Sequence, residues 1–174
     1  MKKIVYLIAI SIVVFGGCSS NKKNQNDTLK NSSAKTPVTI NTGEALNKIE
    51  LKNIDEYFAV KTVADPLVVV LNGSNFKDYF QPAKTMNNHP TTIDFGIERV
   101  GAIILPESWY DVTISLDESY LSGKTLNVSY SIIDGPEKRA FSVKPSKIFS
   151  FKSDLDIDSV AFKNGSNVKT IAIE

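Results

Sequence analysis

Apolar and polar residues alternate along the second half of this chain. The alternation is cleanest over residues 110–116 and 126–132, where every second side chain is apolar and its neighbours are Asp, Asn, Ser or Thr. A period of two is typical of a strand with one buried and one solvated face, so these segments predict antiparallel strands. Further strands, mostly shorter, are predicted at 100–105, 139–143, 147–151, 158–163 and 168–173.

Residues 67–71, Leu-Val-Val-Val-Leu, form a continuous apolar run instead. Such a run is typical of a strand that is buried on both faces, and it ends at the turn signal Asn72-Gly73. Residues 57–63 are expected to be extended. The segment 44–49 fits a helical turn and the start of a strand equally well, so the pattern leaves both open.

A short helix with one aromatic face is predicted after this turn. Ser74 occupies a helix N-cap position, and Phe76, Tyr79 and Phe80 follow at helical spacing. Pro82 lacks an amide hydrogen and limits the helix to about two turns. Aromatic side chains bury large areas, so we interpret this face as packed in the core rather than as a ligand site.

Turn signals divide the strands of the second half. Ser122-Gly123, Asp134-Gly135-Pro136 and Asn164-Gly165 combine residues that favour turns, and Asn-Gly is a strong hairpin signal. Short strands at this spacing, with one early helix, predict a mainly β (β-rich α+β) fold, an antiparallel sandwich or half-open barrel with one short aromatic helix. We expect one such globular domain over residues 37–174.

The N-terminus has a different pattern. Two lysines precede the apolar run 4–15, whose twelve residues fall short of the roughly 20 that span a bilayer as a helix. Gly16-Gly17-Cys18 follows the run. This order is that of a bacterial secretory signal, and with the cysteine it resembles the bacterial lipobox, with Phe15 where Leu is usual. We therefore expect a signal peptide at 1–17, cleavage between Gly17 and Cys18, and lipidation of the Cys18 thiol.

Residues 18–36 are expected to form a lipidated, flexible tether. After the cysteine only Leu29 and Ala34 are apolar, so the segment cannot bury enough surface to offset the entropy of ordering it. As a coil it reaches roughly 23 Å. Ser19 is not the Asp that favours inner-membrane retention, and the Asn-Lys-Lys-Asn at 21–24 is not the acidic cluster of surface-exported lipoproteins. We therefore expect an outer-membrane lipoprotein on the periplasmic face.

Composition adds two constraints. The chain carries 20 Lys and Arg against 19 Asp and Glu; without residues 1–17 the balance is 18 against 19, which changes the net charge from +1 to −1. A charge this close to zero does not attract nucleic acid, and we expect no nucleic-acid partner. Cys18 is the only cysteine, so a packed core must stabilise the domain, and 42% apolar residues make such a core feasible.

Catalytic and metal-binding patterns are sparse. His89, the only histidine, lies in the polar loop 84–92 without clustered ligands or a nucleophile nearby, and is expected to be solvated. Alternating aspartates at 154–158 begin like a calcium loop, but Ser159 stands where the loop needs Gly. We interpret them as the solvated face of a strand, where they discourage edge pairing. The sequence therefore predicts a protein that is not an enzyme, with no cofactor, metal or catalytic residue.

The strongest candidate contact lies at the start of the 110–116 strand. Ser108-Trp109-Tyr110 places the only Trp and a Tyr beside a turn, and such residues are frequent binding anchors. Tyr110 shares the apolar face of Val112 and is expected to pack inward. Trp109 lies on the opposite face and is the better contact candidate of the two, although packing under a neighbouring loop is the interpretation we favour for it. Lys138-Arg139, after the predicted turn, is expected to be solvated.

From residue 57 to 152 the order of elements resembles that of Bacteroides-type small lipoproteins and secreted domains of unassigned function. The shared features are the aromatic helix at 76–80, a Met-containing loop, Ile93-Asp94-Phe95 and a strand ending in Leu105-Pro106-Glu107. More distantly, the order is similar to domains of the protease-complex inhibitor or assembly type, with Ser108-Trp109-Tyr110 where those carry Gly-Gly-Tyr. The resemblance is structural in kind, so it implies no catalytic residue.

These features favour a lipid-anchored, non-catalytic binding or interaction module at the cell envelope. Its membrane contact would be the N-terminal lipid, and its partner a protein or glycan that meets a β-face or the Trp109 loop. Modulation or inhibition of an envelope protease is the alternative, which the more distant resemblance implies.

Overall fold

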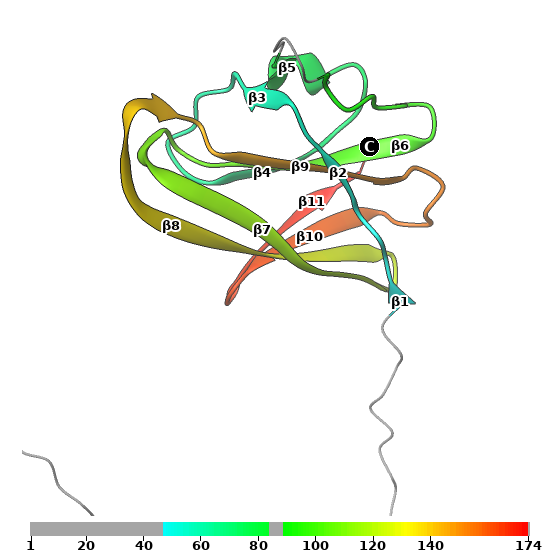
Figure 1. Cartoon of the computed structure of the whole chain (residues 1–174). Helices are drawn as coiled ribbons and strands as arrows, with labels where there is room; N and C mark the ends of the chain where they lie inside the picture. The colour runs from blue at the N-terminus through cyan, green and yellow to red at the C-terminus, as the bar shows by residue number, and fades with distance from the viewer. Residues whose placement is uncertain (1–46, 84–88, 174) are drawn as a thin grey trace, which may run out of the picture. The chain divides into compact units, whose positions relative to one another are not determined.

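The computed structural model describes residues 47–83 and 89–173, whose strands form two main sheets and one small sheet (Figure 1). The five-stranded sheet has the order β1, β7, β8, β10, β11, with bounds Asn47–Lys48, Ser108–Ser122, Thr125–Val143, Ser159–Asn164 and Asn167–Ala172. The four-stranded sheet has the order β2, β9, β6, β4, with bounds Lys52–Ile54, Ser146–Lys152, Glu98–Ile104 and Leu67–Leu71. In the small sheet β3 (Tyr57–Ala59) pairs with β5 (Phe80–Pro82), which follows the short 3-10 helix η1 (Phe76–Asp78). The sheets do not close into a barrel, and the prediction of a mainly β sandwich is confirmed.

The four-stranded sheet lies between the other two layers (Figure 1). One of its faces carries Ile103 and Phe149, which are buried against Val128 and Phe162 of the five-stranded sheet. Its other face is covered by β3, η1 and β5, and the buried residues there are Ile54, Ala59, Leu71, Phe76, Phe80, Val100, Ala102, Ile104 and Ile148. Because both faces of this sheet are covered, β4 and β6 are apolar without alternation, as expected for 67–71.

Gly101 of β6 allows the closest approach within this core. A Cβ at this position would lie 2.3 Å from Cζ of Phe149, its cross-strand partner on β9. No side chain other than hydrogen fits beneath the ring. The ring of Phe149 therefore lies over Gly101, and the rings of Phe151 and Phe162 have centroids 6.5 and 6.1 Å from its own.

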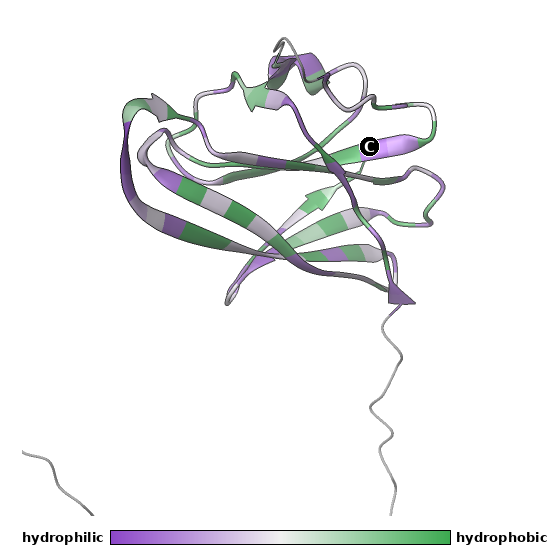
Figure 2. Ribbon diagram, viewed as in Figure 1, coloured by the Kyte–Doolittle hydropathy of each residue, from purple (hydrophilic) through white to green (hydrophobic). Residues whose placement is uncertain are grey.

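The long β7–β8 hairpin shows the predicted alternation of apolar and polar positions (Figure 2). Its turn lies at Ser122-Gly123 as predicted, and Gly123 has a φ of 55°. Such a φ favours glycine because it has no Cβ. The Asn164-Gly165 hairpin between β10 and β11 is also confirmed, with φ 57° at Gly165.

The turn predicted at Asp134-Gly135-Pro136 is wrong. β8 continues through these residues to Val143, and the register shifts instead: Asp134 pairs with Val112 while Lys138 pairs with Tyr110. Three residues of β8 thus lie opposite Asp111 alone, which is a large bulge. Gly135 is suited to this bulge because a Cβ there would lie 2.9 Å from the Asp111 Cβ.

One strand pairing differs from the antiparallel expectation. β10 pairs with β8 in parallel, with Ser159 beside Thr125 and Phe162 beside Val128. The reason is that β9, which lies between them in sequence, belongs to the other sheet. Two successive strands joined by a tight turn are antiparallel. Here the chain reverses direction between β8 and β9 and again between β9 and β10, so β8 and β10 run parallel when they meet in the same sheet.

The predicted aromatic helix is shorter than expected. η1 is one 3-10 turn, and its N-cap is Asn75, without a side-chain capping bond, rather than Ser74. Asn72 instead uses its side-chain oxygen to accept hydrogen bonds from the backbone N–H and the hydroxyl of Ser74. Phe80 then enters β5. The prediction that the aromatic face packs in the core is confirmed, since Phe76 and Phe80 are buried with ring centroids 5.5 Å apart.

The first strands of the domain are short. Within the segment 44–49, the structure describes residues 47–49 and assigns Asn47–Lys48 to β1, while 44–46 lie outside the described residues. The extended segment predicted at 57–63 is a strand only over Tyr57–Ala59.

Candidate functional site

Several predicted features lie outside the described residues. These are the signal peptide 1–17, the Gly17–Cys18 cleavage point, lipidation of Cys18, the tether and residues 37–46 of the predicted domain, and all stay predictions. Within the described ranges, no helix is long and apolar enough to cross a membrane. His89 is described and exposed, as expected, but 84–88 of its loop are not described.

Exposed aromatic residues gather where β7 begins and β8 ends. We call Trp109, Tyr110, Phe141 and Lys138 the aromatic patch. The exposed fractions of the three aromatic side chains are 51%, 51% and 63%. They belong to one paired stretch of the hairpin, between the register positions Ser108–Val143 and Tyr110–Lys138. Trp109 is therefore exposed rather than packed under a loop, and its role as a contact stays a prediction.

The prediction that Tyr110 packs inward is wrong. It assumed that the alternation of Val112 and Ile114 extends back to Tyr110. Tyr110 is 51% exposed, and the register with β8 shifts on both sides of it, so the regular pairing that accompanies burial of Ile114 does not extend to Tyr110. Ser108 begins this irregular stretch, and its hydroxyl accepts a hydrogen bond of 3.0 Å from the backbone N–H of Tyr110.

The two basic residues of this stretch have partners, contrary to the expectation that they are merely solvated. The Lys138 Nζ lies 5.9 Å from the centroid of the Trp109 ring, within the range of a cation–π contact. Arg139 forms an ion pair with Asp111 across the bulge. These contacts hold a cation beside an aromatic surface and leave the outer faces of Tyr110 and Phe141 exposed.

The aspartates at 154–158 lie in the loop before β10 rather than on a strand, which corrects the interpretation that they form a strand face. Asp156 accepts a hydrogen bond of 3.0 Å from Lys124 Nζ, and Asp158 lies 4.0 Å from the same ammonium. The hydrogen bond to Asp156, with the charges of both aspartates, raises the pKa of Lys124. Among the residues that the structure describes, no three His, Cys, Asp or Glu side chains are grouped to hold a metal ion.

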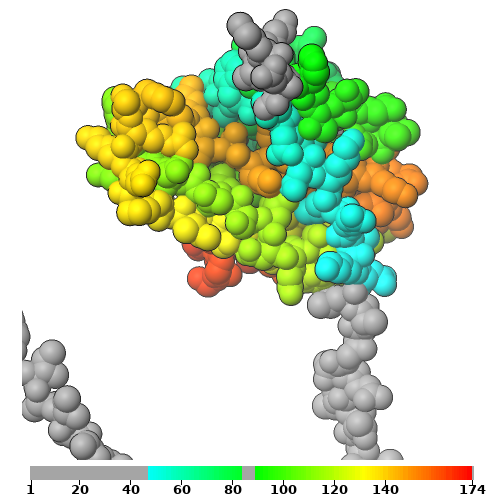
Figure 3. Space-filling model, viewed as in Figure 1, coloured from blue at the N-terminus to red at the C-terminus, as the bar shows by residue number. Residues whose placement is uncertain are grey.

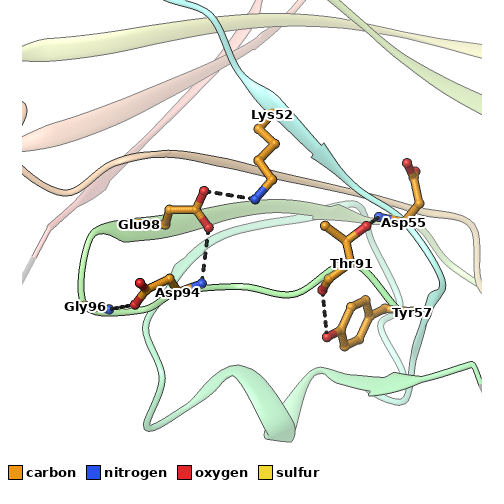
Figure 4. A network of polar contacts seen from close by, with 7 residues as sticks. All are labelled: Lys52, Asp55, Tyr57, Thr91, Asp94, Gly96 and Glu98. Carbon is orange, nitrogen blue, oxygen red and sulfur yellow. Dashed lines mark hydrogen bonds and ion pairs between the residues drawn. The ribbon is translucent and has the colours of Figure 1, made fainter. Parts of the chain in front are cut away.

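A polar network holds residues 91–98 against the core that lies between the four-stranded sheet and the layer of β3, η1 and β5 (Figure 4). Lys52 Nζ donates a 3.1 Å hydrogen bond to one carboxylate oxygen of Glu98, and the other accepts a bond from the backbone N–H of Asp94. The Tyr57 hydroxyl donates to the carbonyl oxygen of Thr91 at 3.2 Å. The donors and acceptors satisfy each other, so we interpret this network as structural.

A groove along β7 was not predicted. Its volume is about 500 Å³, and it runs beside residues 113–119 and the segment that leads from β1 to β2. Sequence alone could not reveal this groove, because it lies beside the edge of β7, and which strands lie beside that edge depends on the strand order of the sheet. Phe141 was also missed, although a lone aromatic residue in the polar stretch 136–142 was a usable signal.

No known protein family, curated protein or solved structure matches this chain.

Proposed function

We propose that this chain is a lipid-anchored lipoprotein of the bacterial outer membrane, facing the periplasm, that acts as a non-catalytic binding module. The address rests on the N-terminal pattern of lysines, apolar run and Cys18. The binding role rests on the aromatic patch, which is the observation that carries the proposal.

The patch has the composition of a binding anchor. Trp, Tyr and Arg are enriched among the residues that dominate interface energies, whereas large aromatic side chains are otherwise mostly buried. Trp109 and Tyr110 are adjacent and each about half exposed, and Phe141 is exposed on the paired strand. The pairing of β7 with β8 holds their backbone in place, so little conformational entropy is lost when a partner covers them. A folded partner protein fits this surface best, because Lys138 already covers part of the Trp109 ring on which a sugar would stack.

The test is affinity capture from envelope extracts with the full-length chain and two variants. Trp109→Ala should lose the partner, whereas Phe58→Ala, which removes a 48% exposed ring from β3, should retain it. Equal capture by all three forms would contradict a role for the patch. Recovery of a protease whose activity changes on binding would favour the protease-modulator alternative.

The address is tested separately. Cys18→Ser should no longer take up labelled fatty acid, because the thiol that would carry the lipid is absent. A variant that is labelled as strongly as the wild type would contradict lipidation at Cys18. Hydrolytic activity of the purified chain would contradict the non-catalytic role.

A further inference from the structure

Among the described residues, β7 is paired along the whole of one side and only near its C-terminal end on the other. On the side facing β8 it is paired from Ser108 to Ser122. On the other side its partner among the described residues is β1, which reaches Tyr120 and Leu121, and the backbone N–H of Ile49 adds a 3.0 Å bond to the carbonyl of Ser119. We call residues 112–118 the open edge of β7. Backbone N–H and C=O groups on such an edge can pair with another chain.

The groove described above follows this open edge. It is lined by every residue from 113 to 119. Successive side chains of a strand point to opposite faces, so a hollow lined by consecutive residues must run along the strand's edge rather than over one face. Figure 3 faces this side of the molecule, with β7 in yellow-green beside the cyan segment that carries β1 and β2.

β1 lies in line with the open edge and pairs with β7 just beyond it, but does not continue along it. This pairing lasts for two residues, after which the chain turns away at Ile49 toward β2 in the other sheet. From Val112 to Leu116 the register between β7 and β8 is uninterrupted, and the bulge at Asp117 ends this stretch. Five regular residues match the usual length of a strand, so a guest strand could continue the line of β1.

The walls of the groove define the chemistry of a guest. Ile114 and Leu116 on β7, with Ile49 and Leu51 opposite, are wholly or partly buried and supply apolar contact. The charged lining residues, none of which forms an ion pair with a described residue, are Lys48, Glu50, Asp117, Glu118 and Lys147. Carboxylates outnumber ammonium groups three to two, and the point where β1 leaves is flanked by Glu50 and Glu118 together with one ammonium, that of Lys48.

We propose that the open edge of β7 binds an extended segment of a partner protein as an added antiparallel strand, with alternating apolar side chains and a basic residue at its N-terminal end, near Glu50 and Glu118. Pairing in the direction of β1 places that end of the guest beside the two carboxylates. Main-chain hydrogen bonds would supply affinity and the alternate side chains specificity. A second copy of this chain fits less well, because its own edge carries the same excess of carboxylates. The site is separate from the aromatic patch and does not depend on the proposed lipid anchor.

The probe is the capped peptide Lys-Val-Thr-Val-Thr-Val-Thr, added to the full-length chain, with hydrogen exchange read by mass spectrometry. At ten times its Kd the peptide should slow exchange about tenfold for those amides of residues 112–118 that face the open edge, because only the unbound fraction exchanges. β11, the opposite outer strand of the same sheet, should be unaffected. Two further peptides, N-methylated on the Val or on the Thr residues, test main-chain pairing. One of the two should no longer bind, since only one set of amides faces β7.

Two variants complete the test. Glu118→Lys should weaken binding of the peptide that begins with Lys and strengthen binding of the same peptide beginning with Glu. Trp109→Ala should leave peptide binding unchanged, which separates this site from the proposed function. The proposal would be overturned by the absence of slowing at millimolar peptide, by full binding of both N-methylated peptides, or by loss of binding in Trp109→Ala. It would also be overturned if the edge were already protected without peptide: dependence on protein concentration would assign the edge to a second copy, and independence to a segment of the same chain.

Discussion

Replacing Gly101 by Ala should destabilise the domain through the ring of Phe149. The added Cβ would lie 2.3 Å from Cζ and 2.5 Å from Cε2 of that ring, whereas carbon atoms in contact lie about 3.5–4.0 Å apart. The ring would have to move by more than about 1 Å. Phe149 is fully buried, with Phe151 and Phe162 packed beside it, so this movement displaces the centre of the core.

The expected cost can be worked from two opposing effects. Overpacking of a core costs about 1–3 kcal/mol, and this contact is short enough to reach the upper end. Ala also restricts the unfolded chain, which returns about 0.4–1 kcal/mol. We therefore expect Gly101→Ala to lower the free energy of unfolding by about 2 kcal/mol, measured by urea denaturation and circular dichroism.

Phe149→Leu provides the control for this prediction. The smaller side chain removes the atoms that the new Cβ would meet, so the double variant should be more stable than the sum of the two single effects by about 1 kcal/mol or more. Strict additivity, or a Gly101→Ala variant within about 0.5 kcal/mol of the wild type, would refute the reasoning.

Three further predictions concern turns, the patch and pH. Gly123→Ala and Gly165→Ala should each lower the free energy of unfolding by about 1 kcal/mol, because φ is positive at both positions. No atom lies within 4 Å of the added Cβ, so the loss is conformational rather than steric. Unchanged melting temperatures in thermal unfolding would contradict this. Trp109→Ala and Phe141→Ala should change stability by no more than about 0.5 kcal/mol, since both side chains are exposed; a larger loss in urea denaturation would mean that the patch is structural. Burial raises the pKa of the Tyr130 phenol, so the unfolded chain ionises first and stability should fall as pH rises above about 10. Tyr130→Phe should lose less stability than the wild type between about pH 9 and 11, and equal losses would contradict this.

The alternation of side chains predicted the strands well wherever pairing is regular. Val112 to Leu116 and Leu126 to Ile132 each present one face to a core, so their period records their environment directly. The Asn164-Gly165 hairpin was equally predictable, because its two strands are adjacent in sequence and the turn is local.

Features set by distant neighbours could not be predicted in this way. Asp134-Gly135-Pro136 has turn chemistry, but a bulge uses the same residues, and the choice depends on Asp111 of the opposing strand. Tyr110, which lies beside the same bulge, is exposed although its spacing suggested that it packs inward. Of the candidate site, Trp109 could be found from sequence, whereas the open edge of β7 follows from β1 being only two residues long.

The parallel pairing of β8 with β10 has a consequence for the order in which the molecule assembles. While the chain is being synthesised, the hairpin of β7 and β8 can form early. The edge of β8 that pairs with β10 stays unpaired until residues 159–164 have been made, and these follow β9, which belongs to the other sheet. Contacts between such distant segments form slowly, because a long loop must close first. We therefore expect the last hairpin to join late in folding, and a nascent chain that lacks it to expose Leu126 and Val128 together with unpaired backbone groups of β8. Truncation before residue 159 should accordingly give an aggregating chain rather than a smaller stable domain.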